Sequence, residues 1–141
     1  MIKNIFNPGN NTNNVSYMLL VLRLVVGVLM LTHGMSKFHN LFGDEPIQFP
    51  DPIGVGVTAS LALTVFAEVL CSILLIFGVG TRLAALSLLF TMLVVVFIVH
   101  SNDGFARQEL PLLYAAIYMV IAVTGAGRIS IDSLIYKKLD K

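Results

Sequence analysis

Four long runs of apolar residues, separated by shorter polar segments, organise this chain of 141 residues. The runs cover residues 17–38, 54–79, 83–100 and 110–126. Each is close to the ~20 residues that a helix needs to cross a bilayer. Only helices and closed barrels satisfy the backbone in lipid, and these runs lack the alternation of apolar and polar residues typical of barrel strands. The pattern therefore predicts four transmembrane helices.

The composition supports a membrane protein. The chain is 57% hydrophobic and 12% charged, with a mean hydropathy of +0.87, whereas soluble domains carry about 25% charged residues. We therefore expect a multi-pass protein of the inner membrane, with the lipid bilayer as its solvent. The net charge of +1 gives no indication of a nucleic-acid partner. The single cysteine, Cys71, excludes an internal disulfide, a cysteine zinc site and covalent haem attachment.

Short connections predict the topology. All are short except residues 39–53, so consecutive helices should be antiparallel neighbours, and residues 17–128 should form an all-α, up-down bundle. In that arrangement one side carries most of the basic residues: Lys3, Arg82, Arg128, Lys137, Lys138 and Lys141. The positive-inside rule then puts both termini in the cytoplasm. We expect residues 1–16 to form a polar tail and residues 129–141 an interfacial cytoplasmic segment.

Ionisable residues gather at the other end of this bundle. His33 and Lys37 lie one helical turn apart at the end of the first helix, so they share a face. The third helix ends at His100, and the fourth begins at Glu109. Ionisable groups within a membrane indicate a functional site, and we expect Lys37 or His33, and also His100, to pair with Glu109. The alternative is interfacial anchoring, in which each group only stabilises a helix end.

A second polar feature lies deeper in the second helix. Hydroxyl groups and one carboxyl group recur there at a spacing of four, in Ser60, Thr64, Glu68 and Ser72. Such a stripe faces protein or water rather than lipid. Glu68 could exchange protons with a substrate, or it could form a packing ion pair with Arg23 of the first helix, although the two heights match poorly.

Three further features of the sequence concern ligand contacts or helix packing. Tyr114 and Tyr118, one turn apart on the fourth helix, could contact a quinone or substrate, or could belong to the core. Gly27 and Gly34 should let another helix approach closely. His33 and His100 could in principle ligate a haem b, but two isolated histidines are weak evidence. We expect neither haem nor a metal site.

The order of these motifs resembles the DoxX family of small four-helix bacterial membrane proteins, which includes DoxD-like members. The resemblance covers roughly residues 17–134 and rests on these positions in order: Arg23, His33-Gly34-Met35-Ser36-Lys37, Glu68, Gly78-Val79-Gly80-Thr81-Arg82, His100, Gly104-Phe105, Glu109 and Gly125-Ala126-Gly127-Arg128-Ile129-Ser130-Ile131-Asp132. It implies redox work at the bacterial inner membrane. Some members are subunits of thiosulfate:quinone oxidoreductase or terminal quinol oxidase, and others resemble scaffolds for redox enzymes.

Two main hypotheses follow. The first is a quinone-linked oxidoreductase subunit that takes electrons from a partner protein; its candidate residues are His33, His100, Glu109 and Glu68 for catalysis and Lys37, Arg23, Tyr114 and Tyr118 for substrate binding. Lys37 would stabilise an anion such as thiosulfate or a quinone oxygen. The alternative is a non-catalytic scaffold, or a small-ligand-binding protein, that organises redox or stress-response partners. A proton-coupled transporter with Glu68 as carrier is a third hypothesis, and it would require a homo-oligomer.

Overall fold

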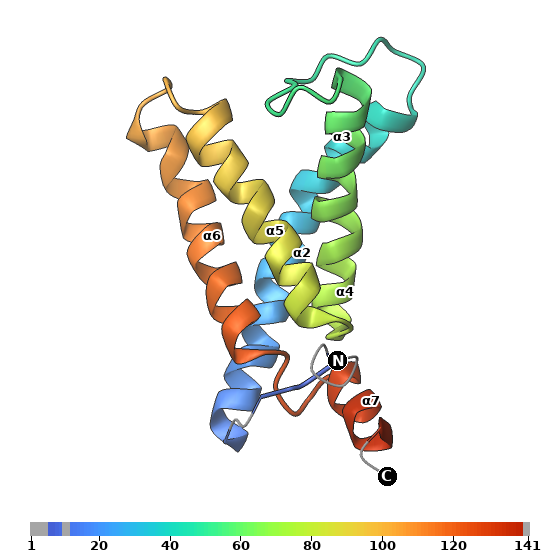
Figure 1. The fold of residues 1–141 in the computed structure, drawn as a ribbon, viewed down its shortest axis with the longest axis vertical. Coiled ribbons are helices and arrows are strands. Elements are labelled where there is room, and N and C mark those ends of the chain that lie inside the picture. Colours follow the sequence, from blue (N-terminus) through green and yellow to red (C-terminus); the bar gives the residue numbers. More distant parts are fainter. Residues whose placement is uncertain (1–5, 10–11, 140–141) are drawn as a thin grey trace.

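The structure is a computed structural model that describes residues 6–9 and 12–139. Every regular element in these residues is helical (Figure 1). The elements, in order, are α2 (Asn13–Phe42), α3 (Val57–Val65), the π-helix η1 (Phe66–Cys71), α4 (Ser72–Phe77), α5 (Thr81–Val94), the π-helix η2 (Val95–Val99), α6 (Phe105–Thr124) and α7 (Ile131–Leu139). The polar tail expected for residues 1–16 lies partly outside the described residues, and α2 already begins at Asn13.

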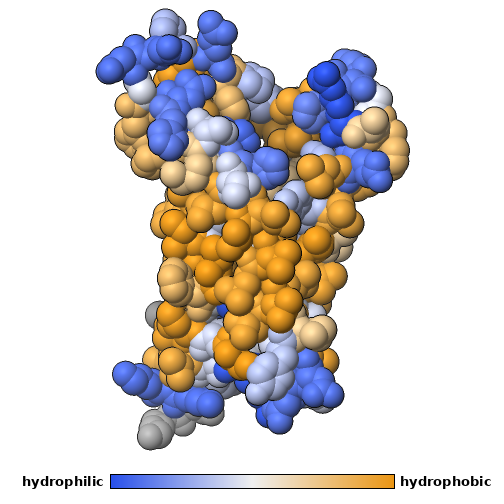
Figure 2. Space-filling view, turned by 180° about the vertical axis from the view of Figure 1, so that it is seen from behind, coloured by the Kyte–Doolittle hydropathy of each residue, from blue (hydrophilic) through white to orange (hydrophobic). Residues whose placement is uncertain are grey.

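Four of the helical stretches are long and apolar enough to cross a bilayer: Asn13–Phe42, Val57–Phe77, Thr81–Val99 and Phe105–Thr124. Figure 2 shows the corresponding surface, a broad apolar belt with hydrophilic residues gathered at both ends of the molecule. Large exposed apolar surfaces of this kind are unusual on soluble monomers. The prediction of four spanning helices is confirmed.

Helix ends differ from the predicted ones by a few residues. α2 continues four residues beyond Phe38 and stops before Gly43. α6 begins at Phe105, five residues before the predicted start, because the loop ends at Gly104 with a φ of 81° that favours glycine. An apolar run predicts only the part of a helix that faces lipid or the core. The first turn of α6 is more polar, so the run does not include it.

The helices form two pairs that diverge toward one end. α2 packs along the continuous helix α3–η1–α4, and α5 packs along α6. Figure 1 shows successive helices joined at alternate ends of the molecule, with α7 at the same end as the beginning of α2. We call this the α7 end, and we call the opposite end, where the two pairs separate, the open end.

The core between the pairs is tightly packed toward the α7 end. Leu75, Ala85, Leu88 and Ile121 are fully buried there. A Cβ atom on Gly27 would lie 2.6 Å from Ile76 Cγ1, so only glycine lets α2 approach α4 this closely. The predicted close helix approach at Gly27 is confirmed.

Arg23 belongs to the α7 end and not to a pair with Glu68. Its guanidinium is fully buried, and it donates to the carbonyl oxygens of Leu75 (3.3 Å) and Ile129 (2.6 Å). Nearby Asp132 accepts from the backbone N–H groups of Gly80 (2.7 Å) and Thr81 (2.9 Å), which begin α5. The expected pair of Arg23 with Glu68 is therefore wrong. Arg23 and Asp132 instead join α2, α4, α5 and α7 through backbone groups at helix ends.

Candidate functional site

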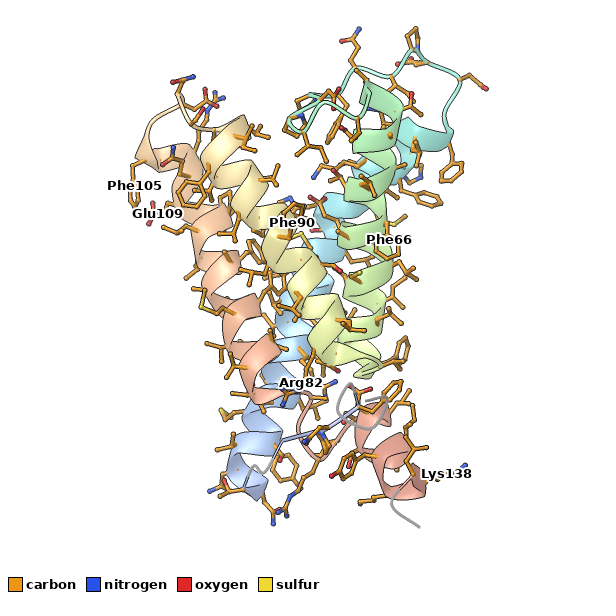
Figure 3. The ribbon with its side chains drawn as sticks, in the orientation of Figure 1. Phe66, Arg82, Phe90, Phe105, Glu109 and Lys138 are labelled. Atoms are coloured by element: carbon orange, nitrogen blue, oxygen red, sulfur yellow. The ribbon has the colours of Figure 1, made fainter. Side chains whose placement is uncertain are left out.

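An ion pair between Lys37 and Glu68 lies at the centre of the candidate site. Lys37 Nζ lies 2.6 Å from one carboxylate oxygen of Glu68 and 2.5 Å from the other. The side chain of Glu68 is 2% exposed and that of Lys37 is 29% exposed. The predicted partner, Glu109, is exposed on α6, and Figure 3 shows it on the side facing away from the other helices. The expected pairing of Lys37 with Glu109 is therefore wrong.

Gly34 explains how Lys37 reaches Glu68. A Cβ at position 34 would lie 2.9 Å from the carbonyl carbon of Glu68 and 3.0 Å from its Cβ. Glycine thus lets α2 approach the backbone of η1, and Lys37 follows one turn later on nearly the same face. Glu68 itself lies within the π-helix η1. Short π-helical segments of this kind occur frequently at functional sites.

The ion pair borders a cavity of about 370 Å³ between α3–η1 and α5–η2 at the open end. Its walls are mainly apolar, with hydroxyl groups from Ser60, Thr64, Ser87 and Thr91. Three of these, Thr64, Ser87 and Thr91, donate to backbone carbonyls four residues earlier. Mainly apolar cavities with a few convergent polar groups are typical small-molecule sites.

The loop of residues 43–56 covers one side of this cavity. Phe49, Pro50, Pro52 and Ile53 line it from this loop. Asp51 fixes the loop to the start of α3, because its carboxylate accepts from Ser60 Oγ (2.6 Å) and from the backbone N–H groups of Val55 (3.0 Å) and Gly56 (2.9 Å). The hydrogen bond from Ser60, supported by the backbone N–H groups, lowers the pKa of Asp51 below its ordinary value.

His100 lines the same cavity from the end of η2. Its Nδ1 lies 2.7 Å from Asp103 Oδ2, and Arg107 Nη1 lies 3.4 Å from the same oxygen. The hydrogen bond with His100, followed by the charge of Arg107, lowers the pKa of Asp103. The expected pairing of His100 with Glu109 is therefore wrong, because the carboxylate in contact with His100 comes from its own loop.

His33 of α2 and the two tyrosines of α6 form a separate group of rings. His33 is exposed, and its ring meets the ring of Tyr114 edge-on at 6.3 Å between centroids. Tyr114 stacks on the fully buried Tyr118 at 6.0 Å. None of the three lines the cavity beside Lys37 and Glu68. The structure therefore brings together Lys37, Glu68 and His100 around one cavity, and it separates them from His33, Tyr114, Glu109 and Arg23.

Sequence reasoning missed the contribution of α5 and of the loop. Ser87, Phe90 and Thr91 line the cavity from α5. Ser87 and Thr91 repeat at a spacing of four inside an apolar run, the same signal that marks Ser60 and Thr64 in the second helix. Comparing the two hydroxyl stripes could have placed the two helices on either side of one site. The sequence of the loop contains no comparable pattern that would predict its contacts with the cavity.

Four helices long and apolar enough to cross a bilayer define a multi-pass membrane protein, and comparison with known proteins agrees. The chain belongs to the DoxX family, whose sequence profile matches residues 18–101. It is 31% identical over 126 residues to an uncharacterized protein of Haemophilus influenzae, covering 84% of this chain and 83% of that protein. It is 30% identical over 123 residues to the inner membrane protein YqjF of Escherichia coli, covering 84% and 92%.

A third relative has a name that states an activity. This Bacillus subtilis protein, "Putative oxidoreductase CatD", is 27% identical over 121 residues, covering 84% of this chain and 87% of that protein. No solved structure gives a significant match.

Proposed function

We propose that this chain is a quinone-binding subunit of an inner-membrane oxidoreductase. In this proposal the helices cross the membrane as an antiparallel, up-down bundle with both termini in the cytoplasm, as the distribution of Lys and Arg favours. The open end then lies at the periplasmic side. Lys37 and Glu68 bind the polar ring of the quinone, and the apolar walls of the cavity hold the rest of the molecule.

One observation carries the proposal: a charged pair borders an apolar cavity within the membrane-spanning part of the bundle. Ionisable groups at this depth are costly and are usually functional. A cavity of about 370 Å³ falls within the range of small-ligand sites, about 300–1,000 Å³. The name of the relative CatD and the inner-membrane location stated for YqjF are consistent with such a role.

The charge balance of the cavity favours a neutral ligand. Both carboxylate oxygens of Glu68 engage Lys37, so the positive charge is already neutralised. His100 is likewise paired with Asp103. An anion such as thiosulfate would find no unpaired cation among these four residues, whereas a neutral carbonyl oxygen can accept the remaining N–H of Lys37.

Reduction of a quinone needs two electrons and two protons. In this proposal a partner protein supplies the electrons. Lys37, Glu68 and His100 are the ionisable groups at the cavity; Lys37 can donate a proton to the quinone, and the Glu68 carboxylate can accept one and return it to Lys37. If no partner delivers electrons, the same cavity would serve a protein that only binds the ligand.

Binding of a short-chain quinone to the purified protein in detergent tests the proposal. We expect saturable binding at micromolar concentration, weakened at least tenfold by Glu68→Gln. Glu109→Gln is the matched control, because it makes the same chemical change at an exposed carboxylate outside the cavity. Absence of binding to wild type, or equal effects of the two substitutions, would contradict the proposal.

A further inference from the structure

The loop of residues 43–56 closes the cavity on the side of the open end. It contributes four apolar lining residues, three of them from the segment Phe49-Pro50-Asp51-Pro52. The two prolines stiffen this segment because each fixes its own φ. Asp51 adds three hydrogen bonds from Val55, Gly56 and Ser60, so the loop is tied to α3 at the point where the helix begins.

The side walls of the cavity, in contrast, belong to the surface that faces lipid. Leu63, Phe66 and Phe90 all line the cavity, yet they are 53%, 50% and 61% exposed. A side chain that both lines a cavity and forms the outer surface marks a place where the cavity reaches that surface. Phe66 and Phe90 come from η1 and α5, the two walls of the cavity (Figure 3).

This lateral opening lies near the middle of the membrane. Phe90 is nine residues from Thr81 and nine from Val99, the two ends of its apolar span. Phe66 is nine residues from Val57 and eleven from Phe77. Both residues therefore stand close to the midplane of the hydrocarbon region, at about the level of the buried Glu68.

We propose that the Lys37–Glu68 cavity takes its ligand from the hydrocarbon of the bilayer, between Phe66 and Phe90, and that Asp51 holds the loop closed against water. The ligand class is then a lipid-dissolved molecule with a neutral polar head and an apolar tail. The inference rests on the proposed function only in that the cavity binds a ligand. It concerns the route, and a water-soluble ligand would have to come past the loop instead.

Reaction of a cavity cysteine with two kinds of thiol reagent tests the route. The protein carries Thr64→Cys in a Cys71→Ala background and is reconstituted in phosphatidylcholine vesicles; Thr64 lines the cavity and Cys71 is buried in the core. One reagent is an apolar maleimide that partitions into lipid, and the other is a membrane-impermeant sulfonated methanethiosulfonate. Ser101→Cys is the control, because Ser101 is exposed in the loop before α6.

We expect the cysteine at position 64 to react with the apolar reagent. With the charged reagent, it should react at least tenfold more slowly than the cysteine at position 101. Adding Asp51→Asn should raise the rate of the charged reagent at position 64 by about tenfold and leave position 101 unchanged. Equal relative rates before the Asp51 change, or no reaction with the apolar reagent, would overturn the inference. No quinone is present in this assay, so its outcome is independent of the binding titration.

Discussion

Removing Lys37 should lower the stability of the protein far more than removing Glu68. Glu68 is 2% exposed, whereas 29% of the Lys37 side chain is exposed. Lys37→Met leaves a buried carboxylate without its cation, and breaking a buried pair in this way costs about 3–5 kcal/mol. Glu68→Met leaves an ammonium group on a long, flexible side chain that is already partly exposed, so we expect a smaller cost of about 1–2 kcal/mol.

The double variant Lys37→Met/Glu68→Met should recover most of the lost stability. Replacing a buried ion pair by apolar side chains of similar volume is often neutral, so we expect the double variant to lie within about 1 kcal/mol of wild type. The two single costs sum to at least about 4 kcal/mol, so the coupling free energy between the two positions should be at least about 3 kcal/mol.

Denaturant unfolding of the four proteins in detergent micelles, followed by circular dichroism, gives the free energies of unfolding. The reasoning would be refuted if the cost of the double variant equalled the sum of the two single costs, or if Glu68→Met were the more damaging single change. Either result would mean that the pair does not determine the energetics of this part of the core.

Three further predictions concern single residues. Gly34→Ala should destabilise the protein by about 1–3 kcal/mol through overpacking, despite the higher helix propensity of alanine, and it should weaken quinone binding. Gly27→Ala should lower the stability but leave quinone binding unchanged, because its new methyl group meets Ile76 away from the cavity. Asp132→Ala should cost about 0.5–2 kcal/mol in denaturant unfolding through loss of the helix cap, with quinone affinity unchanged. The lowered pKa of Asp51 means that its carboxylate stabilises the fold above its unfolded pKa, and that this contribution is lost as the pH falls through the folded pKa. Asp51→Asn should therefore lower the melting temperature at pH 7, and the difference from wild type should shrink below about pH 4.

The sequence was informative about the spanning helices because lipid imposes a simple rule on them. A run of about 20 apolar residues has few alternatives to a transmembrane helix, and the four runs appear as four spanning helices. The polar stripe through Glu68 was also readable, because a spacing of four puts side chains on one face. Two of its members, Glu68 and Ser72, are fully buried in the structure.

The partners of the charged residues could not be read in the same way. Sequence order places Glu109 at the same end as Lys37, but it does not say which way the carboxylate faces on α6. The rotation of each helix about its axis decides this, and that rotation depends on close contacts such as the one at Gly34. Arg23 shows the same difficulty, since its acceptors Leu75 and Ile129 are backbone carbonyls without any sequence signature.

Photoaffinity labelling with an azido-quinone in native membranes, with the attached residues mapped by mass spectrometry, tests the central claim most directly. The account predicts labelling of the segments that line the cavity, around Thr64–Glu68 and Ser87–Thr91, and competition by unlabelled quinone. Labelling confined to the other side of the bundle, around His33 and Tyr114, would contradict it, as would labelling that excess quinone does not reduce.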